Sequence, residues 1–259
     1  MQKRNLSDVT FLIPVRIESP ERHENIQMVI KFLKTRFITF IIVLEADTRE
    51  KVKQRYIDKK IFIKDHDPVF HHTKYRNRMS IASTTPFIAV WDTDVLMPPG
   101  QIIAAVHMLR KNEADMVFPY DGNFLDTTSV IRNLYKVKMD MDILTKNKDK
   151  FFKPYGYFSD GGAFIVRRDA FLTAGMENEN FYGWGAEDIE RVKRWEILEY
   201  RVKRVEGPLF HLSHPRNENS WFGSNQLEKR NRGELLKICM MNKSELTKYV
   251  NSFKWVPGK

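Results

Sequence analysis

The sequence of 259 residues contains a single cysteine, Cys239, and has no long apolar run. One cysteine allows no internal disulfide bond, which favours a reducing compartment. No segment approaches the ~20 apolar residues that a membrane span requires, and the first residues lack the apolar stretch of a signal peptide. Internal repeats and low-complexity tracts are also missing. Because 42% of the residues are hydrophobic, we expect one large globular domain. The lack of disulfide bonds and of a signal peptide favours the cytoplasm.

Acidic residues are outnumbered: 33 Asp and Glu stand against 43 Lys and Arg, so the formal net charge is +10. A basic protein suits three kinds of partner, which are nucleic acid, an anionic membrane surface and a phosphorylated substrate. The sequence signatures of the common DNA- and RNA-binding modules are absent, so we expect no nucleic-acid partner. Two basic clusters, 191–194 and 201–204, alternate with apolar residues and indicate a solvated face more than a binding site.

Short apolar runs alternate along the chain with segments of helical spacing. Ser19, Pro20 and Glu21 form a helix start, with a capping hydroxyl, a proline at the first helical position and an acid in the first turn. The pattern predicts strands over 9–13, 38–44, 61–63, 86–91, 116–118 and 162–166, and helices after 19, over 101–109 and 169–174, after 188 and from about 226. The polar segment 121–157 is interpreted as an insertion or loop. This alternation favours an α/β fold, with a sheet covered by helices on both faces.

Residues 181–188 contain the most informative motif, a Gly-Trp-Gly loop that leads into two adjacent carboxylates. Gly183 and Gly185 lack a Cβ, so the backbone there can turn tightly or lie close to a ligand. Trp184 offers a flat apolar face that can pack against a sugar ring. Glu187 and Asp188 lie at a predicted helix N-terminus, where the helix dipole favours negative charge. One carboxylate there can hold hydroxyls while its neighbour removes a proton. The alternative is a tight turn with a capping Asp.

A second acidic motif, Asp92-Thr93-Asp94, ends the apolar strand predicted over 86–91, and a Pro-Pro-Gly turn follows. In an open α/β sheet, ligands bind beyond the carboxyl ends of the strands. Two carboxylates one residue apart at such a place suit a hard divalent cation that carries a phosphate-bearing ligand. The alternative is a strand-terminal turn whose Asp side chains cap the next helix.

The chain resembles nucleotide-sugar glycosyltransferases of the GT-A fold over residues 9–219. Within that class it is similar to the inverting β-1,4-galactosyltransferase group and to related bacterial enzymes that build capsular and chondroitin-like polysaccharides. The most specific likeness spans 161–190, where Gly-Gly, a strand, a helix and Gly-Trp-Gly-x-Glu-Asp follow in the family's order and spacing. The resemblance implies a Rossmann-like, mostly parallel central sheet flanked by helices, in a single domain.

Residues 70–77 also resemble a family element, Phe-Asn-Arg-x-x-x-x-Asn, but depart from it. This chain has His71 and His72 where the family has Asn and Arg, and the family's Arg binds the donor. We expect Lys74, Arg76 or Arg78 to supply the lost charge, with Arg76 as the preferred donor-binding residue.

The resemblance also implies a divalent cation, Mn²⁺ or Mg²⁺, that stabilises the departing diphosphate as a Lewis acid. The second Asp of the family's Asp-x-Asp, here Asp94, is the expected metal ligand. Asp92 is expected to bind the ribose or the donor sugar, or to support the metal indirectly. The family's metal-binding His corresponds in register to His211, with His214 as the alternative, and imidazole nitrogen suits Mn²⁺. The family's Met ligand is Pro208 here, so fewer protein ligands are expected.

The acceptor side follows from the same resemblance. Asp188 is expected to be the general base that takes the proton of the acceptor hydroxyl, which favours inversion because a related retaining group carries Glu-Asn at this place. Glu187 would hold donor or acceptor hydroxyls. Trp184 would stack on a sugar, and Gly185 would lie beside it.

The nucleoside half of the donor is expected near the ends of the first two strands. Pro14 and Arg16 resemble the family's uridine-contacting turn, and Glu45 and Asp47 resemble its base- or ribose-binding acids, although both acids could instead cap local structure. Gly162 is expected to let the backbone approach the donor sugar.

These expectations together describe a metal-dependent glycosyltransferase. It would transfer galactose or N-acetylgalactosamine from a UDP-sugar to a saccharide or lipid-linked oligosaccharide, in bacterial surface polysaccharide synthesis, at the inner face of an anionic membrane. The expected division is a donor half over 1–100, an acceptor half over 101–225 that includes the segment 121–157, and a helical extension over 226–259. The alternatives are a retaining enzyme of the same fold and a non-catalytic sugar- or nucleotide-binding module. A nucleotidyltransferase is disfavoured because the chain has no glycine-rich phosphate loop near its N-terminus.

Overall fold

The structure, a computed structural model of the chain, describes residues 2–53, 55–156 and 158–258. The strands of its main sheet are β1 (Arg4–Val15), β2 (Phe37–Asp47), β3 (Lys59–Lys64), β4 (Phe87–Trp91), β6 (Met116–Phe118), β8 (Ala163–Arg167) and β9 (Val202–Arg204). They lie in the order β3-β2-β1-β4-β8-β6-β9. The strands from β3 to β4 are mutually parallel, whereas β8 runs antiparallel to both β4 and β6. The predicted α/β sheet, mostly parallel, is therefore confirmed.

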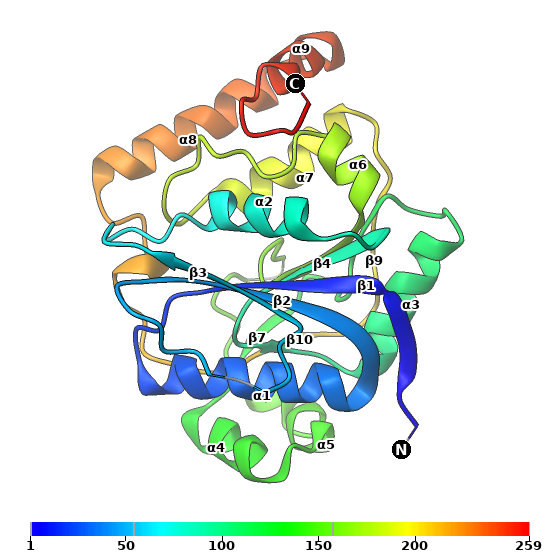
Figure 1. Cartoon of the computed structure of the whole chain (residues 1–259), viewed down its shortest axis with the longest axis vertical. Helices are drawn as coiled ribbons and strands as arrows, with labels where there is room; N and C mark the ends of the chain where they lie inside the picture. The colour runs from blue at the N-terminus through cyan, green and yellow to red at the C-terminus, as the bar shows by residue number, and fades with distance from the viewer. Residues whose placement is uncertain (1, 54, 157, 259) are drawn as a thin grey trace.

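Helices cover both faces of this sheet, with α1 on one face and α2 and α7 on the other (Figure 1). The helices are α1 (Pro20–Arg36), α2 (His72–Ala82), α3 (Pro99–Arg110), α4 (Ser129–Lys138), α5 (Met141–Thr145), α6 (Arg168–Thr173), α7 (Glu187–Ile197), α8 (Asn225–Cys239) and α9 (Lys243–Asn251), with 3-10 turns at Lys148–Lys150 and Glu218–Ser220. The start of α1 is the predicted one, because the Ser19 hydroxyl accepts a hydrogen bond from Arg22 N at 3.1 Å and Pro20 follows it. Among the described residues, no helix combines the length and the apolar character needed to cross a bilayer.

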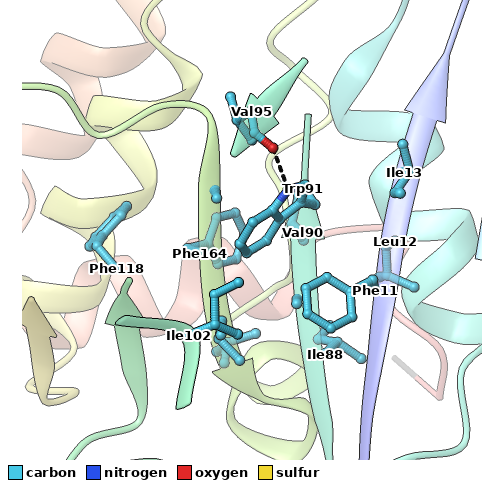
Figure 2. Packing of buried hydrophobic residues seen from close by; sticks show 14 of the residues in the cluster. Phe11, Leu12, Ile13, Ile88, Val90, Trp91, Val95, Ile102, Phe118 and Phe164 are labelled. Carbon is cyan, nitrogen blue, oxygen red and sulfur yellow. Dashed lines mark hydrogen bonds between the residues drawn. The ribbon is translucent and has the colours of Figure 1, made fainter. Parts of the chain in front are cut away.

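The core fixes the turn that follows β4. Phe11 of β1 packs edge-to-face on Trp91, with ring centroids 5.1 Å apart, and both rings are fully buried. The indole Nε1 of Trp91 donates a hydrogen bond of 3.0 Å to the carbonyl oxygen of Val95, as Figure 2 shows. A buried N–H needs such a partner. This bond closes the chain around residues 92–94 and holds the two Asp residues at the end of the strand.

A second, three-stranded sheet lies beside the carboxyl end of β4. Its strands are β5 (Val95–Leu96), β10 (Leu209–His211) and β7 (Phe124–Asp126), in the order β5-β10-β7. His211 pairs with Val95 on one side and with Asp126 on the other. Segments more than eighty residues apart therefore meet next to Asp94.

Several predicted boundaries differ from the observed ones. The first strand continues through Pro14 to Val15, because β4 pairs only with residues Val9–Leu12 and Pro14 lies beyond those pairs. The segment 121–157 is not simply a loop, since its described residues include β7, α4 and α5. The helices α8 and α9 agree with the helical prediction, and Ile238 and Leu246 carry them into the main core.

The helix α7 buries charged residues as well as apolar ones. Trp195 is fully buried, whereas the apolar Ile189 is 48% exposed. Arg191 and Arg194 are fully buried instead, so the expectation of a solvated basic face is wrong at these two positions. Both guanidiniums pair with buried carboxylates, Arg191 with Glu177 and Arg194 with Glu190. Buried charge pairs, together with the apolar contacts of Trp195, therefore dock this helix.

Candidate active site

One cleft of about 420 Å³ contains both acidic motifs. Asp92 and Asp94 enter it from the turn after β4, and Glu187 and Asp188 enter it from the first turn of α7. His211 and the Gly161-Gly162 turn complete the adjoining walls, and the remaining lining residues include Arg22, His72, Phe124, Tyr155, Phe158, Trp184, His214, Arg216 and Asn219. Two motifs nearly a hundred positions apart thus share one cavity.

The Gly-Trp-Gly loop has a backbone that favours glycine. Gly183 has φ +79° and Gly185 has φ +106°, both in the left-handed region. A Cβ on Gly185 would lie 2.4 Å from the ring of Phe222, which packs edge-to-face on Trp184. The Gly185 N–H donates a 2.8 Å hydrogen bond to Glu187. The loop therefore presents its indole to the cleft at a fixed place before α7 begins.

Asp94, His211 and His214 form a cluster whose potential ligand atoms all lie within 4.8 Å of one another. The two Asp94 oxygens lie 3.5 Å from His211 Nε2 and 3.0 Å from His214 Nε2. The Nδ1 atoms are engaged elsewhere, at 2.9 Å from Asp126 and at 2.8 Å from the Pro215 carbonyl. An Nδ1–H donated to oxygen leaves Nε2 with its lone pair, which is the usual state of a metal-binding imidazole. This donor set, one carboxylate and two imidazoles, fits Mn²⁺.

The charges around Asp94 favour the ionised form of its carboxyl group. Burial alone would raise the pKa of the Asp94 carboxyl, but the nearby His211, His214 and Arg22 outweigh burial and hold its pKa below the ordinary value. Burial alone would lower the pKa of His211, but the carboxylates of Asp94 and Asp126 raise it. The Asp94 carboxyl therefore stays ionised, which is the form in which a carboxylate binds a metal ion.

Asp188 is held by two arginines that do not themselves line the cleft. Arg191 Nη2 donates a hydrogen bond to Asp188 Oδ1, and Arg76 Nη1 lies 3.6 Å from the same oxygen. Gly161 packs against the other oxygen, since a Cβ at Gly161 would lie 2.8 Å from Asp188 Oδ2. The Asp188 side chain is still 28% exposed. It is thus an oriented carboxylate with one side open to the cleft.

Arg76 connects the two acidic motifs, because it contacts both Asp92 and Asp188. Its Nη2 donates a 3.1 Å hydrogen bond to Asp92 Oδ1, and its side chain is only 4% exposed. Burial raises the pKa of Asp92 and the charges of Asp94 and Asp188 add to this, although Arg76 opposes them. Arg76 lines neither the cleft nor the smaller cavity that adjoins it. Lys74 and Arg78 are exposed on α2 and also lie outside both cavities.

A smaller cavity of about 50 Å³ adjoins the cleft and shares Asp92 and Asp94 with it. Pro14 and Arg16 line it. The Arg16 guanidinium is fully engaged, because it donates to the carbonyl oxygens of Ala46 and Asp67 and to the carboxylate of Asp65. Pro14, near the end of β1, therefore forms part of the cavity wall. The guanidinium of Arg16 instead holds the neighbouring loops together.

The two acids at the end of β2 point into local structure. Glu45 is fully buried and accepts hydrogen bonds from the backbone N–H groups of Lys51 and Val52. Asp47 accepts from the Ile17 N–H at 3.2 Å and pairs with Lys51 at 2.8 Å. Neither acid lines the two cavities, so a donor-binding role for them stays a prediction.

Gly162 lies on the cleft wall as expected, in the left-handed region with φ +87°. A Cβ there would lie 2.9 Å from Leu209 Cδ1. The Asp92 N–H donates to the Gly162 carbonyl at 2.9 Å. This contact joins the β8 turn directly to the first acidic motif.

Three residues of the site have no sequence motif of their own. Arg22 lies on α1 and lines both cavities, and Asp126 orients His211 from the segment interpreted as a loop. Arg191 follows Asp188 by three residues, a helical spacing that places two side chains on one face. That spacing is the only signal that the sequence alone offered.

The chain matches the family model described as glycosyltransferase like family 2 over residues 10–255. No curated protein matches its sequence. Among solved structures, it is similar to the catalytic domain of Drosophila β1,4-galactosyltransferase 7 in complex with xylobiose, with 17% identity over 88% of this chain and 79% of that chain and a TM-score of 0.52. Glucosyl-3-phosphoglycerate synthase from Mycobacterium tuberculosis, solved with Mn²⁺, UDP and glucosyl-3-phosphoglycerate, gives 14% identity, coverages of 91% and 81%, and a TM-score of 0.53. TarS from S. aureus gives 11% identity, coverages of 95% and 70%, and a TM-score of 0.53. These likenesses show a shared fold.

Proposed function

The chain belongs to glycosyltransferase like family 2, and on this premise we propose that it transfers a sugar from a UDP-sugar to a saccharide hydroxyl with inversion of the anomeric centre. The observation that carries the proposal is the shared cleft, which the Asp94 cluster and Asp188 both line although they come from different elements. Similar folds have been solved with Mn²⁺ and UDP and with xylobiose. We infer galactose or N-acetylgalactosamine as the sugar from the resemblance of residues 161–190 to galactosyltransferases.

On the donor side, Asp94, His211 and His214 would hold the divalent cation, Mn²⁺ or Mg²⁺. A cation held there supplies Lewis-acid stabilisation of the diphosphate as it departs. Asp126 keeps the His211 ring in place through its 2.9 Å contact to Nδ1. Asp92 faces the same cleft and would contact the donor, with Arg76 fixing its orientation.

On the acceptor side, Asp188 would take the proton of the attacking hydroxyl as a general base. Arg191 and Arg76 would keep its carboxylate oriented, because both guanidiniums lie beside Oδ1. Glu187 would hold sugar hydroxyls, and Trp184 would stack on a sugar ring. Attack from the wall opposite the departing diphosphate inverts the anomeric centre.

The acceptor would be a saccharide or a lipid-linked oligosaccharide in surface polysaccharide synthesis, reached at the inner face of an anionic membrane. The helix α4 supports this membrane contact. Its residues Val130, Leu134 and Val137 follow at spacings of four and three and are 73%, 41% and 80% exposed. The surrounding segment 129–153 contains seven Lys or Arg and three Asp. An exposed apolar stripe in a basic segment is typical of a helix that lies on anionic lipid.

A thermal-shift screen of UDP-sugars with Mn²⁺ tests the donor class, followed by hydrolysis of the best donor. We expect UDP and one UDP-sugar to raise the melting temperature, and Mn²⁺-dependent hydrolysis that Asp94→Ala abolishes. The matched control, Asp149→Ala, removes an exposed carboxylate in the 3-10 turn Lys148–Lys150 and should behave as wild type. Lack of any shift by UDP at saturating Mn²⁺ refutes the proposal. The anomeric configuration of the released sugar, read by NMR at early times, separates inversion from retention.

A further inference from the structure

We propose that Arg22 binds the donor diphosphate and makes the binding of the cation and of the diphosphate cooperative. This inference rests on the proposed function. It concerns a residue on the first turn of α1, far in sequence from both acidic motifs. The evidence is the position of Arg22, the state of its hydrogen-bond donors and the charges beside it.

Arg22 lies where the two cavities meet. It lines the cleft together with Asp188 and lines the smaller cavity together with Pro14 and Arg16. Its Nη1 lies 3.8 Å from Asp94 Oδ2. A group that links a nucleoside at the smaller cavity to a sugar in the cleft would pass the residues shared by both cavities, and Arg22 is the arginine among them.

The donors of Arg22 are loosely engaged. Its guanidinium contacts are Glu18 at 3.8 Å, Asp94 at 3.8 Å and His214 Nε2 at 3.4 Å, and the described residues offer it no shorter hydrogen bond or ion pair. Ordinary N–H···O hydrogen bonds are 2.7–3.2 Å long. In contrast, Arg16 donates at 2.6 to 3.1 Å to several oxygens, so its donors are already used.

The Arg22 side chain is 17% exposed and lines both cavities, so its donors can reach a ligand there. The guanidinium is a planar fork that matches the oxygens of phosphate in a bidentate way. A diphosphate has several such oxygens and a charge that opposes both Arg22 and the cation. Arg22 therefore lies at the right place, carries the right charge and has hydrogen-bond donors available to bind the diphosphate.

The coupling follows from the same distances. A divalent cation bound to Asp94 would lie close to the Arg22 guanidinium, and two like charges repel in a partly buried site. The repulsion weakens the binding of the cation alone. A diphosphate relieves it, because its negative charge attracts both. Cation and diphosphate thus each raise the affinity of the other.

The test compares three variants by calorimetry with UDP at saturating Mn²⁺, and by electron paramagnetic resonance with Mn²⁺ alone. For Arg22→Gln we expect UDP to bind at least about tenfold more weakly, as for a lost charge-assisted hydrogen bond, and Mn²⁺ alone to bind several-fold more tightly. Arg22→Lys keeps the charge but loses the fork, so its UDP affinity should fall while its Mn²⁺ affinity stays near wild type. The control Arg78→Gln, on the exposed side of α2, should match wild type in both.

UDP affinity of Arg22→Gln within twofold of wild type overturns the diphosphate assignment. Weaker binding of Mn²⁺ alone by Arg22→Gln overturns the coupling and makes Arg22 a support of the metal cluster. The proposed function fails separately, if wild-type protein binds no UDP at saturating Mn²⁺. Uridine binding, which involves no phosphate, should be equal in all variants and shows that each has folded.

Discussion

Glu187 and Asp188 are neighbours in the chain, yet α7 gives them opposite surroundings. Asp188 has one open side and two arginines beside Oδ1. Glu187 is buried, and the hydrogen bond that it accepts comes from the neutral Gly185 N–H. Burial raises the pKa of Glu187, and the adjacent charge of Asp188 raises it further. Two adjacent carboxyl groups in different environments suit two tasks, a base and a holder of hydroxyls.

The raised pKa of Glu187 predicts a pH-dependent stability. Its pKa in the folded protein lies above the unfolded value, so the neutral form adds stability at low pH, and this stability is lost as the pH rises through the folded pKa. Glu187→Gln stays neutral and can still accept from Gly185. The free energy of unfolding of the variant relative to wild type should therefore increase from pH 5 to pH 8, by urea unfolding without metal. A constant difference across this range contradicts the assignment.

Residues with a motif could be predicted, and residues that act through space could not. Asp94 and Asp188 stand out because each follows a distinctive local pattern, and His211 was favoured by register alone. Arg22 and Asp126 carry no pattern, since their place depends on how α1 and β7 pack. The expected substitutes Lys74 and Arg78 are exposed because α2 turns them away from the site.

At the scale of elements, the small sheet β5-β10-β7 builds the candidate metal cluster. Its strands are two or three residues long, too short for a reliable alternation signal. The long apolar strands β1, β2 and β4 were predictable because burial on both faces gives continuous apolar runs. The amphipathic helix α4 was not predicted within 121–157, because the polar residues around its apolar positions obscure their helical spacing.

The helix α7 depends on its buried ion pairs, and this predicts an asymmetric effect of two arginine deletions. Arg194 is fully buried, pairs with Glu190 at 2.7 Å and donates to the Met176 carbonyl. Arg194→Ala should lower the free energy of unfolding by about 3–5 kcal/mol, because Glu190 is left buried without its partner. Arg167→Ala removes the partly exposed pair with Asp169 and should cost less than about 1 kcal/mol. Denaturant unfolding measures both, and equal costs contradict this account of α7.

At the scale of the whole molecule, α4 and α5 project at one end and α8 and α9 lie at the other (Figure 1). The chain leaves the α4–α5 region through residues 151–156 and returns to the cleft wall at Tyr155 and Phe158. A membrane that contacts α4 would therefore lie near the open cleft. This arrangement fits an acceptor that remains attached to lipid.

Vesicle binding tests this orientation. A protein with Val130→Ser and Val137→Ser should bind vesicles of phosphatidylglycerol and phosphatidylcholine at least about tenfold more weakly than wild type, because buried CH₂ groups contribute about 0.8 kcal/mol each and the double variant loses several apolar carbons. The matched control, Leu236→Ser with Met240→Ser, removes two residues on and just after α8 that are 62% and 84% exposed. The control should bind as wild type. A loss in the control alone would place the membrane contact at the opposite end.

The central claim is that the Asp94 cluster and Asp188 act on one reaction from different walls of one cleft. The most direct measurement is the Mn²⁺-dependent turnover of the best UDP-sugar by Asp188→Asn, alongside its UDP affinity. We predict that turnover falls by about 10²–10⁴, the usual contribution of a general base, while UDP affinity stays within twofold of wild type. Unchanged turnover in Asp188→Asn would contradict the account.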